Sequence, residues 1–158
     1  MSVLSRLLGK PDHPAITIEP LRRRHLGALM PIEQASYPKP WSLNVFHSEL
    51  EMMRRGERTY FAAMYGKQLA GYAGMLYAGD DAHVTNIAVG SAFQRQGVAT
   101  RLFAELAWAA IERGSTGTQL LAKPHLGDIG HGYRNIVAVR HNDALYCCNI
   151  GNLAWCPN

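Results

Sequence analysis

The sequence predicts an α/β (α+β) fold in which a mixed central sheet is flanked by helices in three layers. First, the periodic segments follow the order strand, helix, helix, strand, strand, strand, helix, strand, which places helices and strands around one sheet. Second, the chain has 158 residues, 47% of them hydrophobic, which suits a single domain, since domains commonly use about 100–150 residues. Third, one strand is apolar at most positions, as expected of a strand covered on both faces.

About the first third of the chain supplies one strand and two helices. Residues 1–14 are expected to form a loosely ordered leader, and Ile16–Ile18 alternates with the period of a short strand. Residues 21–34 have helical spacing, and Pro31 is expected to kink or end that helix. Ser42 is expected to cap a second helix, whose apolar face carries Leu43, Phe46, Leu50 and Met53.

The rest of the chain supplies four more strands and one long helix. The strands are expected over residues 59–65, 69–78, 83–89 and 118–122, the first two forming a hairpin around a glycine turn. After the apolar third strand comes a polar loop over residues 90–96. A helix is expected from Gly97 to Arg113, where Gly114 ends it. Its apolar stripe consists of Val98, Leu102, Phe103, Leu106, Ala109 and Ala110.

Composition excludes several classes of protein. The formal net charge of +4 fits an anionic partner or an ordinary solvated surface, and without a dense basic stripe it does not indicate direct nucleic-acid binding. The cluster Arg22-Arg23-Arg24 is expected to face solvent, because positive charge opposes the dipole at a helix start. No apolar run is long enough for a membrane span, and no secretory signal is evident, so a cytoplasmic location is expected. Cys147, Cys148 and Cys156 match no zinc spacing, so no metal is expected.

A strand, a loop and a helix start together predict a binding site for a phosphate group. The buried strand ending Asn86–Val89 leads into a loop that opens the long helix. Gly97 and Ala99 are small enough to let a ligand approach the backbone, and the first helical turn offers unpaired N–H groups and a positive dipole end. Arg95 and Arg101 can add charge. The alternative is a plain strand–loop–helix connection. The glycine patterns of P-loop and dinucleotide-binding folds are absent.

The motif Gln94-x-x-Gly97-x-Ala99 resembles the pyrophosphate-binding motif of the GNAT acetyltransferases, and the strand Asn86–Val89 resembles the strand that precedes it. The early segment Ile32-Glu33…Tyr37-Pro-Lys-Pro-Trp41-Ser is similar to bacterial ribosomal-protein-alanine N-acetyltransferases of the RimI type. The resemblance covers about Ile16 to Gly114. It implies an acetyl-CoA-binding domain over residues 15–122 and a divergent segment over 123–158. The implied cofactor-binding residues are Ile87, Ala88, Val89, Gln94, Arg95, Gln96, Gly97, Val98, Ala99 and Thr100.

The resemblance also implies roles for two aromatic residues and a peptide acceptor. Tyr37 and Trp41 would shape a groove for the acceptor peptide, although Trp41 also fits as a core aromatic beside the second helix. The implied activity is transfer of an acetyl group from acetyl-CoA to a protein N-terminal amine, with the alanine of a ribosomal protein as acceptor. The alternatives are an acetyltransferase for a small amine and a catalytically impaired module that binds acyl-CoA.

The last quarter of the chain departs from the family pattern. Where the family carries a general-base Glu, register places Leu121, which accepts no proton. Tyr146 is the candidate for the family's general-acid tyrosine, and Asn142 for its asparagine. Three explanations stay open: another base, a module that binds without turnover, or a C-terminal segment translated in a shifted reading frame. The candidate bases are His125, His131 and His141, since imidazole titrates near neutral pH.

Overall fold

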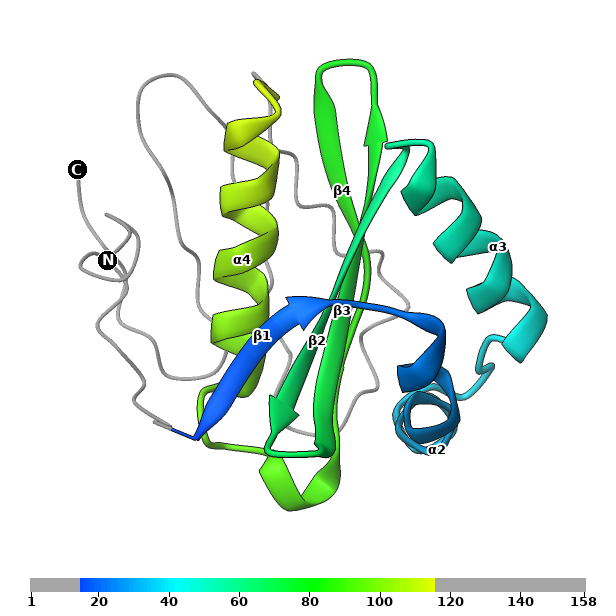
Figure 1. Ribbon diagram of the computed structural model, residues 1–158, viewed down its shortest axis with the longest axis vertical. Helices are drawn as coiled ribbons and strands as arrows, with labels where there is room; N and C mark the ends of the chain where they lie inside the picture. Colours follow the sequence, from blue (N-terminus) through cyan, green and yellow to red (C-terminus); the bar gives the residue numbers. More distant parts are fainter. Residues whose placement is uncertain (1–14, 116–158) are drawn as a thin grey trace.

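The structure, a computed structural model, describes residues 15–115, and in this range the elements follow the predicted order (Figure 1). The leader over 1–14 and the strand over 118–122 lie outside the described residues. In the described range no helix is long and apolar enough to cross a membrane. The elements are β1 (Ile16–Pro20), the 3-10 helix η1 (Arg23–His25), α2 (Leu26–Ser36), α3 (Leu43–Arg54), β2 (Arg58–Tyr65), β3 (Gln68–Ala78), β4 (Asp81–Val89), the 3-10 helix η2 (Ser91–Phe93) and α4 (Val98–Glu112).

The four described strands form one sheet in the order β1-β2-β3-β4, and each pairs antiparallel with the next. Within residues 15–115 the sheet therefore lacks the parallel pairing that a mixed sheet would include. The register between β3 and β4 shifts once, since Gly74 pairs with Asn86 whereas Met75 pairs with Val84. Thr85 is thus the extra residue of a β-bulge, a feature that bends a strand and redirects its side chains.

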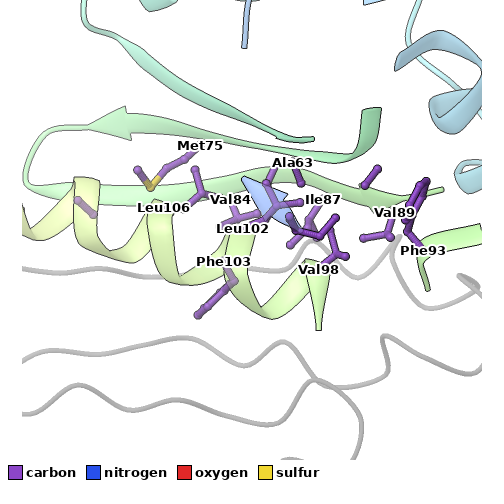
Figure 2. Close-up of a cluster of buried hydrophobic side chains, with 14 of the residues drawn as sticks. Ala63, Met75, Val84, Ile87, Val89, Phe93, Val98, Leu102, Phe103 and Leu106 are labelled. Atoms are coloured by element: carbon purple, nitrogen blue, oxygen red, sulfur yellow. The ribbon is translucent and has the colours of Figure 1, made fainter. Parts of the chain in front are cut away.

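Helix α4 covers one face of the sheet and contacts all four strands. Its predicted apolar stripe explains the contact, since these side chains recur every three or four residues along one side. Figure 2 shows Val98, Leu102 and Leu106 of α4 beside Val84 and Ile87 of β4. All five side chains are buried, so this core fixes the position of α4 relative to the end of β4.

Helices α2 and α3 lie on the side of the sheet opposite α4 (Figure 1), which confirms the three-layer prediction. A second buried cluster fills the space there, and it includes Leu26, Leu29, Phe46, Tyr60, Ala62, Tyr72 and Ala88. In β4, Ile87 and Val89 belong to the core under α4, whereas Ala88 belongs to this second cluster. The end of β4 is therefore covered on both faces, as its apolar sequence predicted.

Of the two outcomes expected at Pro31, a kink or an end of the helix, the structure excludes the end, because α2 continues to Ser36. The carbonyl that loses its hydrogen bond belongs to the exposed Gly27 and can be hydrated instead. Two predictions for α3 differ from the structure. Ser42 occupies the N-cap position of α3, but its exposed side chain makes no capping hydrogen bond. Leu43 is 44% exposed, so it lies outside the buried face of α3 that Phe46 defines.

His25, at the end of η1, is buried and joined to β1. The backbone N–H of Arg22 donates to His25 Nδ1 at 3.0 Å, and His25 Nε2 lies 2.8 Å from Glu19 Oε1 and 3.2 Å from Arg24 Nε. Burial lowers the pKa of His25 below its ordinary value of 6.5, against the opposing effect of Glu19. Arg24 donates to the same carboxylate at 2.6 Å, and this hydrogen bond is the main cause of a lowered pKa at Glu19. The three arginines expected to face solvent are exposed.

We expect the melting temperature to fall between about pH 7.5 and about pH 5.5, with His25 responsible for part of the fall. In the unfolded chain His25 takes up a proton near pH 6.5, whereas the folded state resists protonation until a lower pH. The unfolded state then binds more protons, so stability decreases as pH falls through this window. Glu19 titrates below it, because its pKa is lowered from 4.5. In His25→Gln, thermal melts should depend less on pH, and an unchanged pH dependence would contradict the prediction.

Candidate functional site

The end of β4 presents backbone groups on the side away from β3. The Tyr37 hydroxyl bonds both the N–H and the C=O of Ile87, so these groups point away from β3. Residues two apart in an antiparallel strand direct their backbone groups to the same side, so Val89 does likewise. Consistently, Gln94 Nε2 donates to the Val89 carbonyl at 3.2 Å. In the described part of the chain no strand pairs with this side of β4.

The connection from β4 to α4 is a tight turn rather than the purely polar loop predicted. It begins with η2, whose Phe93 is buried and packs against Tyr65 with ring centroids 5.7 Å apart. The predicted Gln94, Arg95, Gln96 and Gly97 then follow. Arg95 and Gly97 both adopt left-handed backbone, with φ of 63° and 78°. This conformation strains the backbone at Arg95, whereas glycine adopts it freely.

The first turn of α4 offers backbone N–H groups without helical partners. Gly97 is the N-cap and has no side chain to cap the helix, and the first turn contains no acidic residue. Arg101 N–H donates to the Gly97 carbonyl at 3.1 Å, so the amides of Val98, Ala99 and Thr100 precede the first helical hydrogen bond. Together with the positive end of the helix dipole, these amides suit an anion such as a phosphate group.

The two arginines predicted to support this site are placed differently. Arg95 lies in the turn itself and is exposed. Arg101 is half-buried, and its Nη1 donates to the carbonyl of Ile16 at 2.5 Å. Arg101 therefore ties α4 to the start of β1, a contact that its sequence position did not predict, while Arg95 is the arginine at the turn.

Tyr37 brings the predicted acceptor loop into contact with the predicted cofactor strand. It follows the last residue of α2 and has extended backbone, as expected for a residue that precedes a proline. Its N–H donates to the Glu33 carbonyl at 3.1 Å. Its hydroxyl donates to the Ile87 carbonyl at 3.0 Å and accepts from the Ile87 N–H at 3.1 Å. A single phenol thus occupies both backbone groups of Ile87.

Trp41, at the other end of this loop, packs as a core aromatic. Its ring is half-buried against Phe46 of α3, with centroids 5.7 Å apart. Its backbone N–H donates to Glu33 Oε1 at 2.8 Å. The carboxylate of Glu33 is buried, and its other oxygen accepts a hydrogen bond from the Tyr72 hydroxyl. Burial is the main cause that raises the pKa of Tyr72. Glu33 therefore fixes the loop to both α2 and β3.

We expect Glu33→Gln to destabilise the fold by about 1–2 kcal/mol. Glutamine has one carboxamide oxygen, so it cannot accept from both Trp41 N–H and Tyr72, and one buried donor is left without a partner. Glu51→Gln, at a half-buried residue of α3 whose carboxylate pairs with the exposed Arg54, is the matched control and should change stability by less than about 0.5 kcal/mol. Urea unfolding measures both. Equal effects of the two substitutions would contradict this role of Glu33.

A second buried carboxylate connects α3 to the bulge in β4. Glu49 Oε2 accepts from Arg58 Nε at 3.0 Å and from the Tyr60 hydroxyl at 2.8 Å. The Tyr60 hydroxyl also lies 3.1 Å from Thr85 Oγ1, which donates to Asn86 Oδ1 at 2.9 Å. Burial raises the pKa of Tyr60, so its hydroxyl keeps its proton. This network holds the bulged residue in place immediately before the site.

The sequence interpretation assigned no role to these two acids, although a signal was present. Glu33 follows Leu29 by four residues and Glu49 follows Phe46 by three, so each acid lies on the apolar face of its helix. An acidic residue at such a position is buried only where it is paired. The partners, Tyr72 and Tyr60, are on β3 and β2, and no local pattern indicates them.

Several predicted residues lie outside the described residues. Among them is Tyr146, the candidate general acid, and Leu121, at the position of the expected base. The same holds for Asn142, His125, His131, His141 and the three cysteines Cys147, Cys148 and Cys156.

Comparison with known proteins identifies the family. The model of the acetyltransferase (GNAT) family matches residues 26–125, which include the acceptor loop, the end of β4 and the turn into α4. The chain belongs to this family. The resemblance drawn from the motif at Gln94–Ala99 is thereby confirmed, and so is the fold expected from it.

Individual relatives add detail over part of their length. A Bacillus subtilis (strain 168) protein provisionally named as a ribosomal protein bS18-alanine N-acetyltransferase is 30% identical over 83 residues, 52% of this chain and 54% of that protein. The ribosomal-protein-S18-alanine N-acetyltransferase from Escherichia coli is 30% identical with a TM-score of 0.58, over 66% of this chain and 65% of that one. PaiA N-acetyltransferase from Thermoplasma acidophilum, solved with coenzyme A, shares the fold at 14% identity and a TM-score of 0.55, over 66% and 77%. The chain thus spans about half the length of the curated relative.

Proposed function

We propose that this chain transfers the acetyl group of acetyl-CoA to the N-terminal amine of a protein, and that the alanine of a ribosomal protein is the first acceptor to test. The observation that carries the proposal is the start of α4, where no side chain of the described residues caps the helix and three backbone amides follow a left-handed Gly97. This helix start comes soon after the end of β4, on which one side pairs with no described strand. Membership of the acetyltransferase family supports acetyl-CoA as the ligand of this site.

In this proposal the turn holds the diphosphate of coenzyme A. The amides of Val98, Ala99 and Thr100 donate to the phosphate oxygens, and such charge-assisted hydrogen bonds are the strong ones. Gly97 lets the phosphates approach, because a Cβ is absent there. Arg95 adds positive charge from the exposed side of the turn, while Gln94 holds the Val89 carbonyl and so keeps the turn against β4.

The side of β4 that pairs with no described strand receives the rest of the cofactor. Backbone groups of Val89 pair with the amides of the pantetheine arm as a neighbouring strand would, and Ala88 keeps its pairing with β3. The N–H of Ile87 then lies along the same side and donates to the thioester carbonyl. A fixed backbone donor at this position stabilises the negative charge that develops on the carbonyl oxygen during acyl transfer.

The reaction is a direct attack. The neutral amine attacks the carbonyl carbon, a C–N bond forms, the C–S bond breaks, coenzyme A leaves as the thiolate, and the amine loses one proton. Tyr146 is proposed as the acid that protonates the thiolate. The general base is unassigned, and such a base typically contributes about 10²- to 10⁴-fold, so positioning and carbonyl polarisation still support turnover without it.

The acceptor assignment rests on two relatives named for the alanine of a ribosomal protein. The segment Tyr37–Trp41 supports it, because it lies beside Ile87, where an amine must approach. Trp41 packs into the core, so in this proposal it supports the loop and Tyr37 is the residue that faces the acceptor.

Calorimetry with acetyl-CoA, paired with a thiol-release assay on a peptide that begins with alanine, tests the proposal. Binding together with peptide-dependent release of thiol is the expected result. Release with small amines alone would replace the protein acceptor by a small one, and binding without any release would indicate a module that binds acyl-CoA. Absence of binding would overturn the proposal.

A further inference from the structure

The Tyr37 hydroxyl makes with Ile87 the two backbone hydrogen bonds that a neighbouring β-strand would make. A phenol hydroxyl donates one hydrogen bond and accepts others, and here it satisfies the C=O and the N–H of the same residue at 3.0 and 3.1 Å. These are the two groups that a neighbouring strand or an extended ligand would bond. The ring is half-buried, so the contact lies at the margin of the core.

This contact competes with the bound acyl group. In the function proposed above, the Ile87 N–H donates to the thioester carbonyl, but Tyr37 Oη already accepts from that N–H. One N–H directs its proton to one acceptor at a time with good geometry. The described structure therefore has the acyl-binding donor closed, and the carbonyl of acetyl-CoA can bind it only after the phenol has moved.

We propose that Tyr37 is a hydrogen-bond latch: it closes Ile87 when no acyl group is bound, and the acetyl carbonyl displaces it and frees the phenol for the incoming acceptor. The inference rests on the proposed function, because it assumes that acetyl-CoA binds along β4. It adds that the site distinguishes acetyl-CoA from free coenzyme A.

The backbone around Tyr37 allows the phenol to move without unfolding the loop. Both ends of the loop are fixed to Glu33, whose carbonyl accepts from Tyr37 N–H and whose Oε1 accepts from Trp41 N–H. Tyr37 itself has extended backbone, and a side chain there exchanges between staggered rotamers. Opening thus requires rotation of the Tyr37 side chain, which gives up both hydrogen bonds to Ile87 and part of its packing against the second buried cluster.

Free coenzyme A lacks the thioester carbonyl, so it has no group that competes with the Tyr37 hydroxyl for the Ile87 N–H. In the wild type, the hydrogen bond that acetyl-CoA gains at Ile87 is offset by the one that Tyr37 gives up. Without the Tyr37 hydroxyl this offset disappears. The ratio of the dissociation constants, Kd for coenzyme A divided by Kd for acetyl-CoA, therefore measures the latch, and contacts to the diphosphate cancel because both ligands share them.

Calorimetry on Tyr37→Phe and the wild type, as full chains, tests the inference. We expect the ratio to rise about 3- to 10-fold in Tyr37→Phe, the range that corresponds to one net hydrogen bond. Tyr65→Phe removes a hydroxyl from an exposed tyrosine of β2 and is the matched control, with the ratio unchanged. Thermal melts verify that each variant is folded. An equal ratio in Tyr37→Phe and the wild type would overturn the latch.

A second measurement uses only the wild type, in case Tyr37→Phe does not fold. In protein labelled with ¹⁵N-isoleucine, the amide signal of Ile87, assigned by its loss in Ile87→Val, should shift with acetyl-CoA beyond its shift with coenzyme A. Equal shifts with the two ligands would overturn the latch and the assignment of the Ile87 N–H to the thioester carbonyl, while acetyl transfer from a bound acetyl-CoA would still stand. Failure of the wild type to bind either ligand would instead overturn the proposed function, and the latch with it.

Discussion

Replacing Gly97 by valine should weaken acetyl-CoA binding by about a hundredfold or more. Gly97 has φ of 78°, a conformation that a β-branched residue avoids, so the turn must rearrange and the first amides of α4 move. Losing two hydrogen bonds to charged phosphates costs about 1.5–3 kcal/mol each, and each 1.4 kcal/mol is tenfold in affinity. Calorimetry with acetyl-CoA measures the change.

Gly114→Val is the matched control for this prediction. Gly114 also has φ of 78°, lies just past the other end of α4, and has open space around it. Both substitutions impose similar backbone strain, of about 1–3 kcal/mol, so their melting temperatures should fall alike. Only Gly97→Val should lose acetyl-CoA. Comparable affinities in the two variants would refute the assignment of this turn to the diphosphate.

Replacing Gly74 by alanine should destabilise the fold by about 3 kcal/mol or more, which lowers the melting temperature by about 10 °C. A Cβ at Gly74 would lie 1.9 Å from Tyr60 Cε1 and 2.3 Å from Cζ. Tyr60 has no room to withdraw, since it is fully buried and its hydroxyl is bonded to Glu49 and lies within hydrogen-bond distance of Thr85. Overpacking of this kind also breaks the network that holds the β4 bulge.

Gly27→Ala is the contrasting substitution of the same type. Gly27 lies in α2, and a methyl group attached there would have no atom within 4 Å of it, so alanine should stabilise the helix by about 0.5–1 kcal/mol. The clash at Gly74 is tested further by adding Tyr60→Leu, since the cost of Gly74→Ala should shrink once the ring is absent. Strictly additive effects would show that the ring is not the cause.

The regular elements and the left-handed turn into α4 were predictable because their signals are local. The stripe on α4 and the alternation in β1 follow from residues close in sequence, and Gly97 marks the turn within a short motif. The pairing of Glu33 with Tyr72 spans 39 residues, and that of Tyr37 with Ile87 spans 50. Such contacts depend on how α2 packs on the sheet, which no local spacing records, so the contact of Tyr37 with Ile87 emerged only from the structure.

The loop from Tyr37 to Trp41 is hydrogen-bonded at both ends to one residue, Glu33. The contacts that hold the loop in place are therefore made at its ends and do not involve its tip. Its tip, Pro38 to Pro40, is exposed and belongs to neither core cluster. In the proposed function, exchanging those three residues is therefore expected to change the choice of acceptor, while the hydrophobic interior and the turn into α4 stay as they are.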